Sequence, residues 1–138
     1  MVTTLAIDIG GTGLKMIALD EAGQPITERT RIPTPQPATA DAILAALGEM
    51  VASHGDFDRV SVGFPGVVEE GVIKSAANLH PSWIGVDVVA ALSERTGKPT
   101  RAANDADMQG WGVIEGKGVE LVLTLGTGLG SAIFVDGQ

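Results

Sequence analysis

The chain has 138 residues, of which 44% are hydrophobic and 19% charged, so it can bury one compact core and is not a disordered segment. Its formal net charge is −8 and no basic face is visible, which argues against a nucleic-acid-binding module. No apolar stretch reaches the roughly 18 residues of a membrane span, no signal-peptide pattern opens the chain, and Cys is absent, which excludes disulfides and thiolate metal sites. We expect a cytoplasmic protein with no nucleic-acid and no membrane partner.

The first third of the chain is predicted to begin with antiparallel strands. Strands are expected over residues 4–9, 14–19 and 24–32, and the glycines between the first two mark a hairpin turn. Three prolines then end regular structure: Pro33, Pro35 and Pro37. Apolar side chains at helical spacing predict a helix over residues 39–54, with Thr39 or Asp41 as its cap.

Strands and helices alternate in the rest of the chain. Strands are predicted over 59–64, 100–103, 119–125 and 131–135, helices over 86–96 and 104–115, and a small hairpin or extended loop over 67–75. This order predicts an α/β fold, a mixed sheet covered by helices. The softest boundary is Gly116–Gly118, so we predict one domain over 1–118 and the opening hairpin of another over 119–138.

A glycine-rich turn between the first two strands is the first candidate site. The segment Asp8–Lys15 reads Asp-Ile-Gly-Gly-Thr-Gly-Leu-Lys. Backbone amides of such a turn can approach phosphate oxygens, and the Thr12 hydroxyl can add a hydrogen bond. Lys15 supplies a positive charge, and Asp8 can hold Mg²⁺ through water. The alternative is an ordinary glycine-rich hairpin with an exposed aspartate.

A second glycine-rich turn, Leu123–Gly130, repeats the pattern of the first with the sequence Leu-Thr-Leu-Gly-Thr-Gly-Leu-Gly. It resembles a dinucleotide fingerprint only loosely, because a strand rather than a helix is predicted to follow it. A tight hairpin is the alternative explanation, although two such turns in one small chain make coincidence less credible.

The pair Asn104-Asp105 lies where a strand is predicted to meet a helix. A carboxylate at that position can accept a proton from a sugar hydroxyl, and the amide of Asn104 can orient the same hydroxyl. Asn and Asp are also preferred helix caps, and Asp107 is assigned mainly to that role. Further along the fold, Gly66 and Asn78 are weaker candidates for sugar contacts, whereas His80 and Trp83 are assigned to ordinary loop and packing roles.

Taken together, these motifs resemble the ROK family of sugar kinases over essentially the whole chain, and within it the polyphosphate-dependent glucokinases most. The resemblance rests on Asp8–Lys15, Gly66 with its neighbours Gly-Phe-Pro, Pro81–Gly85, Asn104–Asp107 and Leu123–Gly137. It implies the actin-like ATPase (ribonuclease H-like) fold, with helices on both faces of the mixed sheet. It also implies a chain that continues beyond Gln138 in family members.

The resemblance implies a role for each matched residue. Asp105 would be the general base on the 6-hydroxyl of glucose or a related hexose. The implied substrate contacts are Asn104, Gly66, Asn78 and Gly128. The implied phosphate contacts are Asp8, Gly10, Gly11, Thr12, Gly13, Lys15, Thr124, Gly126, Thr127 and Gly128. Asp8 would hold Mg²⁺ through water, and the phosphoryl donor would be ATP, inorganic polyphosphate or both.

Two other functions stay open at this point. A sugar-responsive transcription regulator of the same family would carry a helix-turn-helix domain before the first glycine turn, whereas Met1 leads directly into the first strand. A non-catalytic sugar- or phosphate-binding or assembly module is the other alternative. A homodimer is the expected assembly, and the sequence does not decide whether the 138 residues are active alone.

Overall fold

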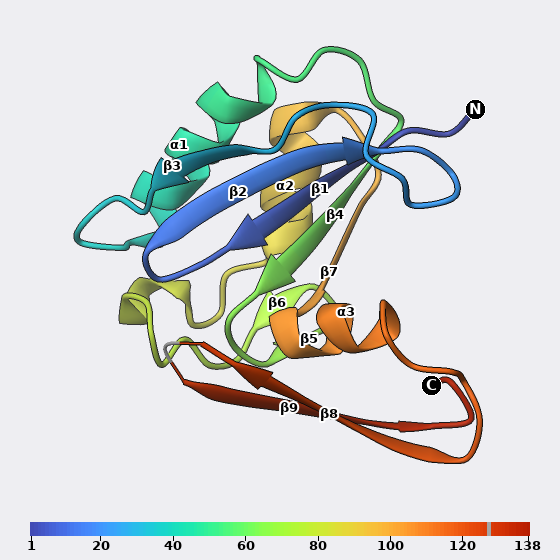
Figure 1. The fold of residues 1–138 in the computed structure, drawn as a ribbon. Helices are drawn as coiled ribbons and strands as arrows, with labels where there is room; N and C mark the ends of the chain where they lie inside the picture. The colour runs from blue at the N-terminus through green and yellow to red at the C-terminus, as the bar shows by residue number, and fades with distance from the viewer. Residues whose placement is uncertain (127) are drawn as a thin grey trace.

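The computed structural model describes residues 1–126 and 128–138, and a five-stranded mixed sheet is its largest element (Figure 1). The strand order is β3-β2-β1-β4-β7. The strands are β1 (Thr4–Ile9), β2 (Gly13–Leu19), β3 (Thr30–Pro33), β4 (Arg59–Phe64) and β7 (Thr100–Asn104). Strands β1, β4 and β7 are parallel, whereas β2 and β3 pair antiparallel. The carboxyl ends of three parallel strands therefore meet at one edge of the sheet.

One face of this sheet is buried under two helices, α1 (Ala40–Val51) and α2 (Val88–Thr96). Alternate side chains of β1 point into this core, and Leu5, Ile7 and Ile9 are fully or almost fully buried. Each helix begins at a side-chain cap, Thr39 or Asp87, whose oxygen accepts a backbone N–H of the first turn. Of the two caps predicted for the first helix, Thr39 is the one used, whereas the cap Asp87 of α2 was not predicted.

The third helix, α3 (Asp105–Trp111), follows β7 directly and lies over the other face of the sheet. There the sulfur of Met108 is 3.2 Å from the position that a Cβ of Gly63 would take. The prediction of helices on both faces is therefore confirmed. Nearby, the 3₁₀ turn η1 (Pro81–Trp83) buries Trp83, whose ring lies 4.9 Å from that of Phe64.

Several predicted elements are shorter than expected: α1 covers 40–51 rather than 39–54, and α2 covers 88–96 rather than 86–96. The strand predicted over 24–32 is regular only over Thr30–Pro33. The Asp20 carboxylate accepts the N–H groups of Ala22 and Gln24 in the turn before it. The Ala18 N–H then donates to the Thr27 hydroxyl at 3.0 Å, where a paired strand would offer a backbone carbonyl. The helix predicted over 104–115 ends at Trp111, and Gly112 is its C-cap. Glycine at that position weakens continuation of the helix.

The last two strands, β8 (Val119–Leu125) and β9 (Leu129–Val135), form a separate two-stranded sheet, and β9 begins two residues earlier than predicted. Their inner face packs on α3, where the Phe134 ring covers Gly110 and lies 6.1 Å from the Trp111 ring. The predicted hairpin at 67–75 is also present, as β5 (Val68–Glu69) and β6 (Val72–Ile73).

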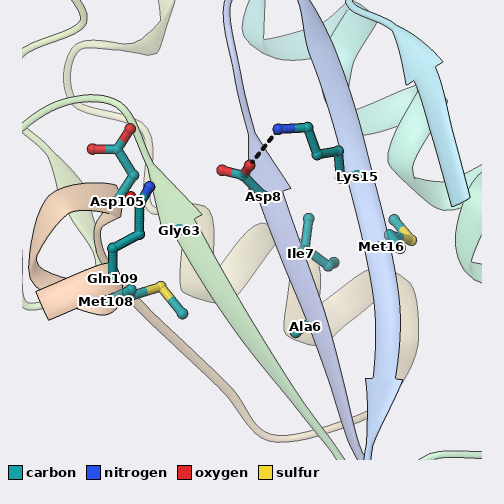
Figure 2. Close-up of a pocket in the computed structure, with 9 residues that line it drawn as sticks. All are labelled: Ala6, Ile7, Asp8, Lys15, Met16, Gly63, Asp105, Met108 and Gln109. Atoms are coloured by element: carbon teal, nitrogen blue, oxygen red, sulfur yellow. Dashed lines mark hydrogen bonds and ion pairs between the residues drawn. The ribbon is translucent and has the colours of Figure 1, made fainter. Parts of the chain in front are cut away.

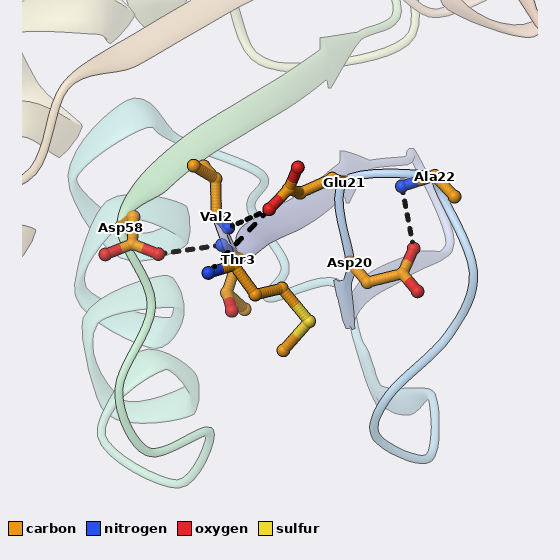
Figure 3. Close-up of polar contacts among 7 residues, drawn as sticks. Val2, Thr3, Asp20, Glu21, Ala22 and Asp58 are labelled. Atoms are coloured by element: carbon orange, nitrogen blue, oxygen red, sulfur yellow. Dashed lines mark hydrogen bonds and ion pairs between the residues drawn. The ribbon is translucent and has the colours of Figure 1, made fainter.

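Side-chain contacts hold the first residues against neighbouring loops (Figure 3). The Thr3 N–H donates to the Asp58 carboxylate at 2.7 Å, and the Val2 N–H donates to the Glu21 carboxylate at 2.9 Å. These bonds fix the start of β1, the strand that carries Asp8 near its end. In residues 1–126 and 128–138, no helix is long and apolar enough to cross a membrane.

Candidate active site

A cavity of about 610 Å³ opens at the carboxyl ends of the parallel strands, between the two glycine-rich turns. In open α/β sheets this edge is the usual place for a ligand. Most of the predicted site residues line it: Asp8, Gly10, Gly11, Thr12, Lys15, Asn78, Asn104, Asp105, Thr124, Gly126 and Gly128. The tertiary structure thus gathers segments that lie more than a hundred positions apart in the sequence.

Two carboxylates and one lysine form the polar centre of the site (Figure 2). Asp8, near the end of β1, pairs with Lys15 of β2, and the Lys15 Nζ lies 3.3 Å from the Asp8 Oδ2. Asp105 comes from the first turn of α3, across Gly63. Asp8, Lys15 and Asp105 also line an adjoining cavity of about 260 Å³, together with Gly63.

Gly63 leaves the space between the two carboxylates open. A Cβ on this residue would lie 3.8 Å from both the Asp8 Oδ1 and the Asp105 Cα, and closer still to Met108. Any larger side chain at this position would therefore project between the two acids. The sequence reading did not identify Gly63 as a site residue, since a glycine within a strand carries no local signal of what lies across the sheet.

The environment of Asp105 favours its protonated form. Burial raises the pKa of the Asp105 carboxyl, and the charges of Asp8 and Asp107 raise it further. Hydrogen bonds from the backbone N–H groups of Ala106 and of Asp105 itself act in the opposite direction. A raised pKa strengthens a carboxylate as a base, which is the property expected of a group that accepts a proton during a reaction.

The side chain of Asn104 is used mainly to hold the site together. Its Oδ1 accepts the N–H groups of Ala106 and Asp107, at 2.9 and 3.4 Å, and caps α3. Its Nδ2 donates to the carbonyl oxygen of Gly66 at 2.8 Å. Asn104 therefore orients Asp105 through the helix start, and one N–H of its amide stays available for a hydroxyl in the cavity.

Hydrogen bonds from residues 34 and 36 hold the carbonyl groups of the first glycine turn. The Thr34 hydroxyl donates to the Gly10 carbonyl at 2.6 Å, and the Gln36 amide donates to the Gly11 carbonyl at 3.4 Å. The Thr34 N–H donates to the Thr12 carbonyl at 3.2 Å. Within the described part of the chain, the N–H groups of Gly11 and Thr12 have no acceptor. Unpaired amide donors in such a turn are suited to an anion.

The second glycine turn lies on the opposite side of the cavity. The Gly126 N–H donates to the Gly128 carbonyl at 3.0 Å, and the Thr124 hydroxyl lies directly over Gly130. A Cβ on Gly130 would also lie 3.2 Å from that of Ala106 at the start of α3. The predicted contact at Thr127 lies outside the described residues.

Two predicted contacts do not line either cavity. Gly13 lies beneath the guanidinium of Arg31, and Gly66 packs against the carbonyl of Ser75, where any Cβ would overlap it. A direct role of either residue in binding stays a prediction. Conversely, the cavity is also lined by Gln109, which the sequence did not indicate, and by residues of the predicted motifs to which no role was assigned: Pro65, Ala106, Leu125, Leu129, Gly130 and Ser131.

No cluster of three or more metal-ligating His, Cys, Asp or Glu side chains occurs in residues 1–126 and 128–138. Mg²⁺ is commonly held by one or two carboxylates together with water and substrate phosphates. Asp8 provides one such carboxylate at the cavity, and water and the phosphates of a ligand would complete the shell. The residues present therefore fit a magnesium ion that binds together with a phosphate ligand.

Comparison with known proteins identifies the family. The ROK family profile matches residues 4–138. The chain belongs to the ROK family. It is 39% identical to the polyphosphate glucokinase of Mycobacterium tuberculosis over 95% of the chain and 52% of that protein. It is 34% identical to an N-acetylmannosamine kinase of Escherichia coli over 99% of the chain and 48% of that protein. The chain thus spans about half the length of the curated relatives it matches.

Solved structures of ROK family members share the fold. An inorganic polyphosphate/ATP-glucomannokinase from Arthrobacter superposes with a TM-score of 0.90 at 41% identity, covering 100% of this chain and 60% of that one. A ROK family glucokinase from Streptomyces griseus, solved with glucose and AMPPNP, gives 0.85 at 29% identity, over 99% and 45%. A ROK family transcriptional regulator also gives 0.80, at 20% identity, so the fold alone does not assign an activity.

Proposed function

We propose that this chain forms the phosphate-binding and catalytic-aspartate part of a sugar kinase, which transfers a phosphoryl group to the 6-hydroxyl of glucose or a related hexose. The observation that carries the proposal is one cavity in which Asp105, with a raised pKa, faces two glycine-rich turns. Phosphoryl transfer requires these parts: a cradle for the phosphates, positive charge, and a base that orients the attacking hydroxyl.

In the proposed reaction, Asp105 accepts the proton of the sugar 6-hydroxyl as its oxygen attacks the terminal phosphorus of the donor. The new oxygen–phosphorus bond forms while the bond to the next phosphate of the donor breaks, and the electron pair leaves with that phosphate. Asn104 holds the start of α3 and hence the Asp105 carboxylate in place. The free N–H groups of Gly11 and Thr12 and the Lys15 ammonium bind the transferred group.

Mg²⁺, when held by Asp8 through water, would neutralise charge on the donor phosphates. Asp8 contributes to the same region in a second way, because its pairing with Lys15 fixes the position of the ammonium group. A positive charge held in place before the reaction stabilises developing negative charge at little reorganisation cost.

Relatives point to a set of candidate substrates. Three of these relatives are named as a polyphosphate glucokinase, an N-acetylmannosamine kinase and an inorganic polyphosphate/ATP-glucomannokinase. Glucose with inorganic polyphosphate, ATP or both is therefore the first combination to test, followed by mannose and N-acetylmannosamine. A homodimer also stays a prediction.

The decisive experiment measures hexose 6-phosphate formation by the 138-residue chain with Mg²⁺ and either donor. Asp105→Asn keeps the size of the side chain but removes the base, and we expect it to lower kcat about 10²- to 10⁴-fold. Asp107→Asn is the matched control, since it removes an acid from the same helical turn. That variant should keep most of the activity.

Equal activity of the Asp105→Asn variant and the unchanged chain would contradict the assignment of the base. If the unchanged chain forms no product but binds glucose in a calorimetric titration, the non-catalytic binding module becomes the better description. If it binds neither sugar nor donor, the proposal for these 138 residues is wrong.

A further inference from the structure

Arg31 continues a row of charged side chains that starts in the proposed active site. The register of the sheet places Lys15 opposite Asp8 on one side and opposite Arg31 on the other. Opposed residues on neighbouring strands project from the same face of a sheet. Asp8, Lys15 and Arg31 therefore run across β1, β2 and β3 on the cavity side.

The guanidinium of Arg31 lies directly over the first glycine turn. A Cβ on Gly13 would be 2.6 Å from its Nε and 2.7 Å from its Nη2. The Nη2 also donates to the Thr12 carbonyl at 3.4 Å. The absence of a side chain on Gly13 thus allows the cation to lie flat against the turn, next to the residues with unpaired N–H groups.

The charge of Arg31 is not neutralised, whereas that of Lys15 is partly offset by Asp8. The ion pairs of residues 1–126 and 128–138 are Lys15 with Asp8 and the amino terminus with Glu21. Arg31 is solvent-exposed and donates one N–H to a carbonyl oxygen, so its other N–H groups have no acceptor in this part of the chain. A planar guanidinium with several free donors matches the oxygens of a phosphate group.

We propose that Arg31 binds a second phosphate of the phosphoryl donor, adjacent to the phosphate held by the glycine turn. This inference rests on the proposed function. It assigns Arg31 to the part of the donor's phosphate chain that extends from the transfer site over Gly13. The shared chemistry is a linear phosphate chain. Inorganic polyphosphate and ATP are its two sources.

The experiment measures equilibrium binding by calorimetry, without sugar, for the 138-residue chain and three variants. The ligands are orthophosphate, tripolyphosphate, long-chain polyphosphate and ATP with Mg²⁺. Arg31→Gln removes the charge, Arg31→Lys keeps it, and Arg95→Gln removes a similar exposed arginine that also donates to a carbonyl oxygen, on α2 far from the turn.

We expect Arg31→Gln to weaken binding of tripolyphosphate and polyphosphate about tenfold and to leave orthophosphate binding nearly unchanged. Arg31→Lys, which keeps the charge but loses the planar set of donors, should keep only part of the affinity, and Arg95→Gln all of it. If Arg31→Gln loses affinity for the inorganic phosphate chains but not for ATP, Arg31 is assigned to polyphosphate. If it loses affinity for both ligands, Arg31 serves either donor.

Three results would overturn the inference. Equal weakening of orthophosphate and polyphosphate would mean that Arg31 only supports the turn. An equal effect of Arg95→Gln would mean that general surface charge attracts the ligand, and failure of the unchanged chain to bind any phosphate chain would remove the site. Because no sugar or transfer is involved, these outcomes are independent of whether the chain proves to be a kinase.

Discussion

The two glycine-rich turns have almost the same sequence but different surroundings. Gly10–Gly13 is held from behind by three side chains of the segment 31–36, which bind its carbonyl groups. In the second turn, Gly126–Gly130, the Thr124 side chain of the same hairpin covers Gly130, and the start of α3 lies beside it. Leu125 and Leu129, near the two ends of this turn, are largely exposed. A Gly-Thr-Gly sequence thus specifies a turn, and only neighbouring segments decide whether its amide groups are held in position for an anion.

The largest expected difference between the turns is steric. A Cβ on Gly10 would lie 2.8 Å from the Gly13 carbonyl oxygen, whereas, apart from the chain neighbours, no atom of the described residues lies within 4 Å of a Cβ on Gly126. Gly10→Ala should therefore lower the free energy of unfolding by about 1–3 kcal/mol. Gly126→Ala should change it by less than about 0.5 kcal/mol. Urea denaturation of both variants measures the difference, and equal losses would show that the turns are equally constrained.

A smaller effect is expected from removing a contact behind the first turn. Thr34 is buried, and its hydroxyl binds the Gly10 carbonyl, so Thr34→Val should cost about 1 kcal/mol of stability and weaken orthophosphate binding. Thr96→Val is the control, because it removes a hydroxyl that binds a carbonyl within α2. Phosphate binding that falls in both variants, or in neither, would contradict a specific role of the 31–36 segment.

The smallest expected effect concerns Asp105, which faces both turns across the cavity. Its pKa in the folded chain is raised above the unfolded value, so the free energy of unfolding falls as pH rises from the unfolded pKa through the folded one. Asp105→Asn removes this penalty. The Tm of the variant minus the Tm of the unchanged chain should therefore be larger at pH 7 than at pH 3. Thermal unfolding followed by circular dichroism measures this difference. A larger gain at pH 3 would contradict the raised pKa.

The same raised pKa has a consequence for activity. Asp105 acts as a base only when ionised, so kcat/KM should rise with pH through its folded pKa and then level off. This profile, recorded with either donor, would connect the stability measurement to the proposed reaction. A profile that falls over the same range would assign the controlling group elsewhere.

The sequence alone predicted the mixed α/β sheet and most of the residues that line the cavity. Strand alternation, helix caps and glycines are local signals, because they reflect backbone geometry within a few residues. Asp8, Lys15 and Asp105 could be selected for the same reason, since each lies next to a glycine turn or at a strand end. The boundary proposed after Gly118 stays a prediction, although β8 and β9 do form a sheet of their own.

Only the tertiary structure decided what surrounds those residues. The support of the first turn by Thr34 and Gln36, the cation of Arg31 over Gly13, and the opening left by Gly63 between two carboxylates all join segments far apart in the chain. The raised pKa of Asp105 has the same origin, because burial and neighbouring charge are properties of the packed molecule. Local sequence therefore determined which chemical groups are present, and long-range packing determined which of them are held, charged or exposed.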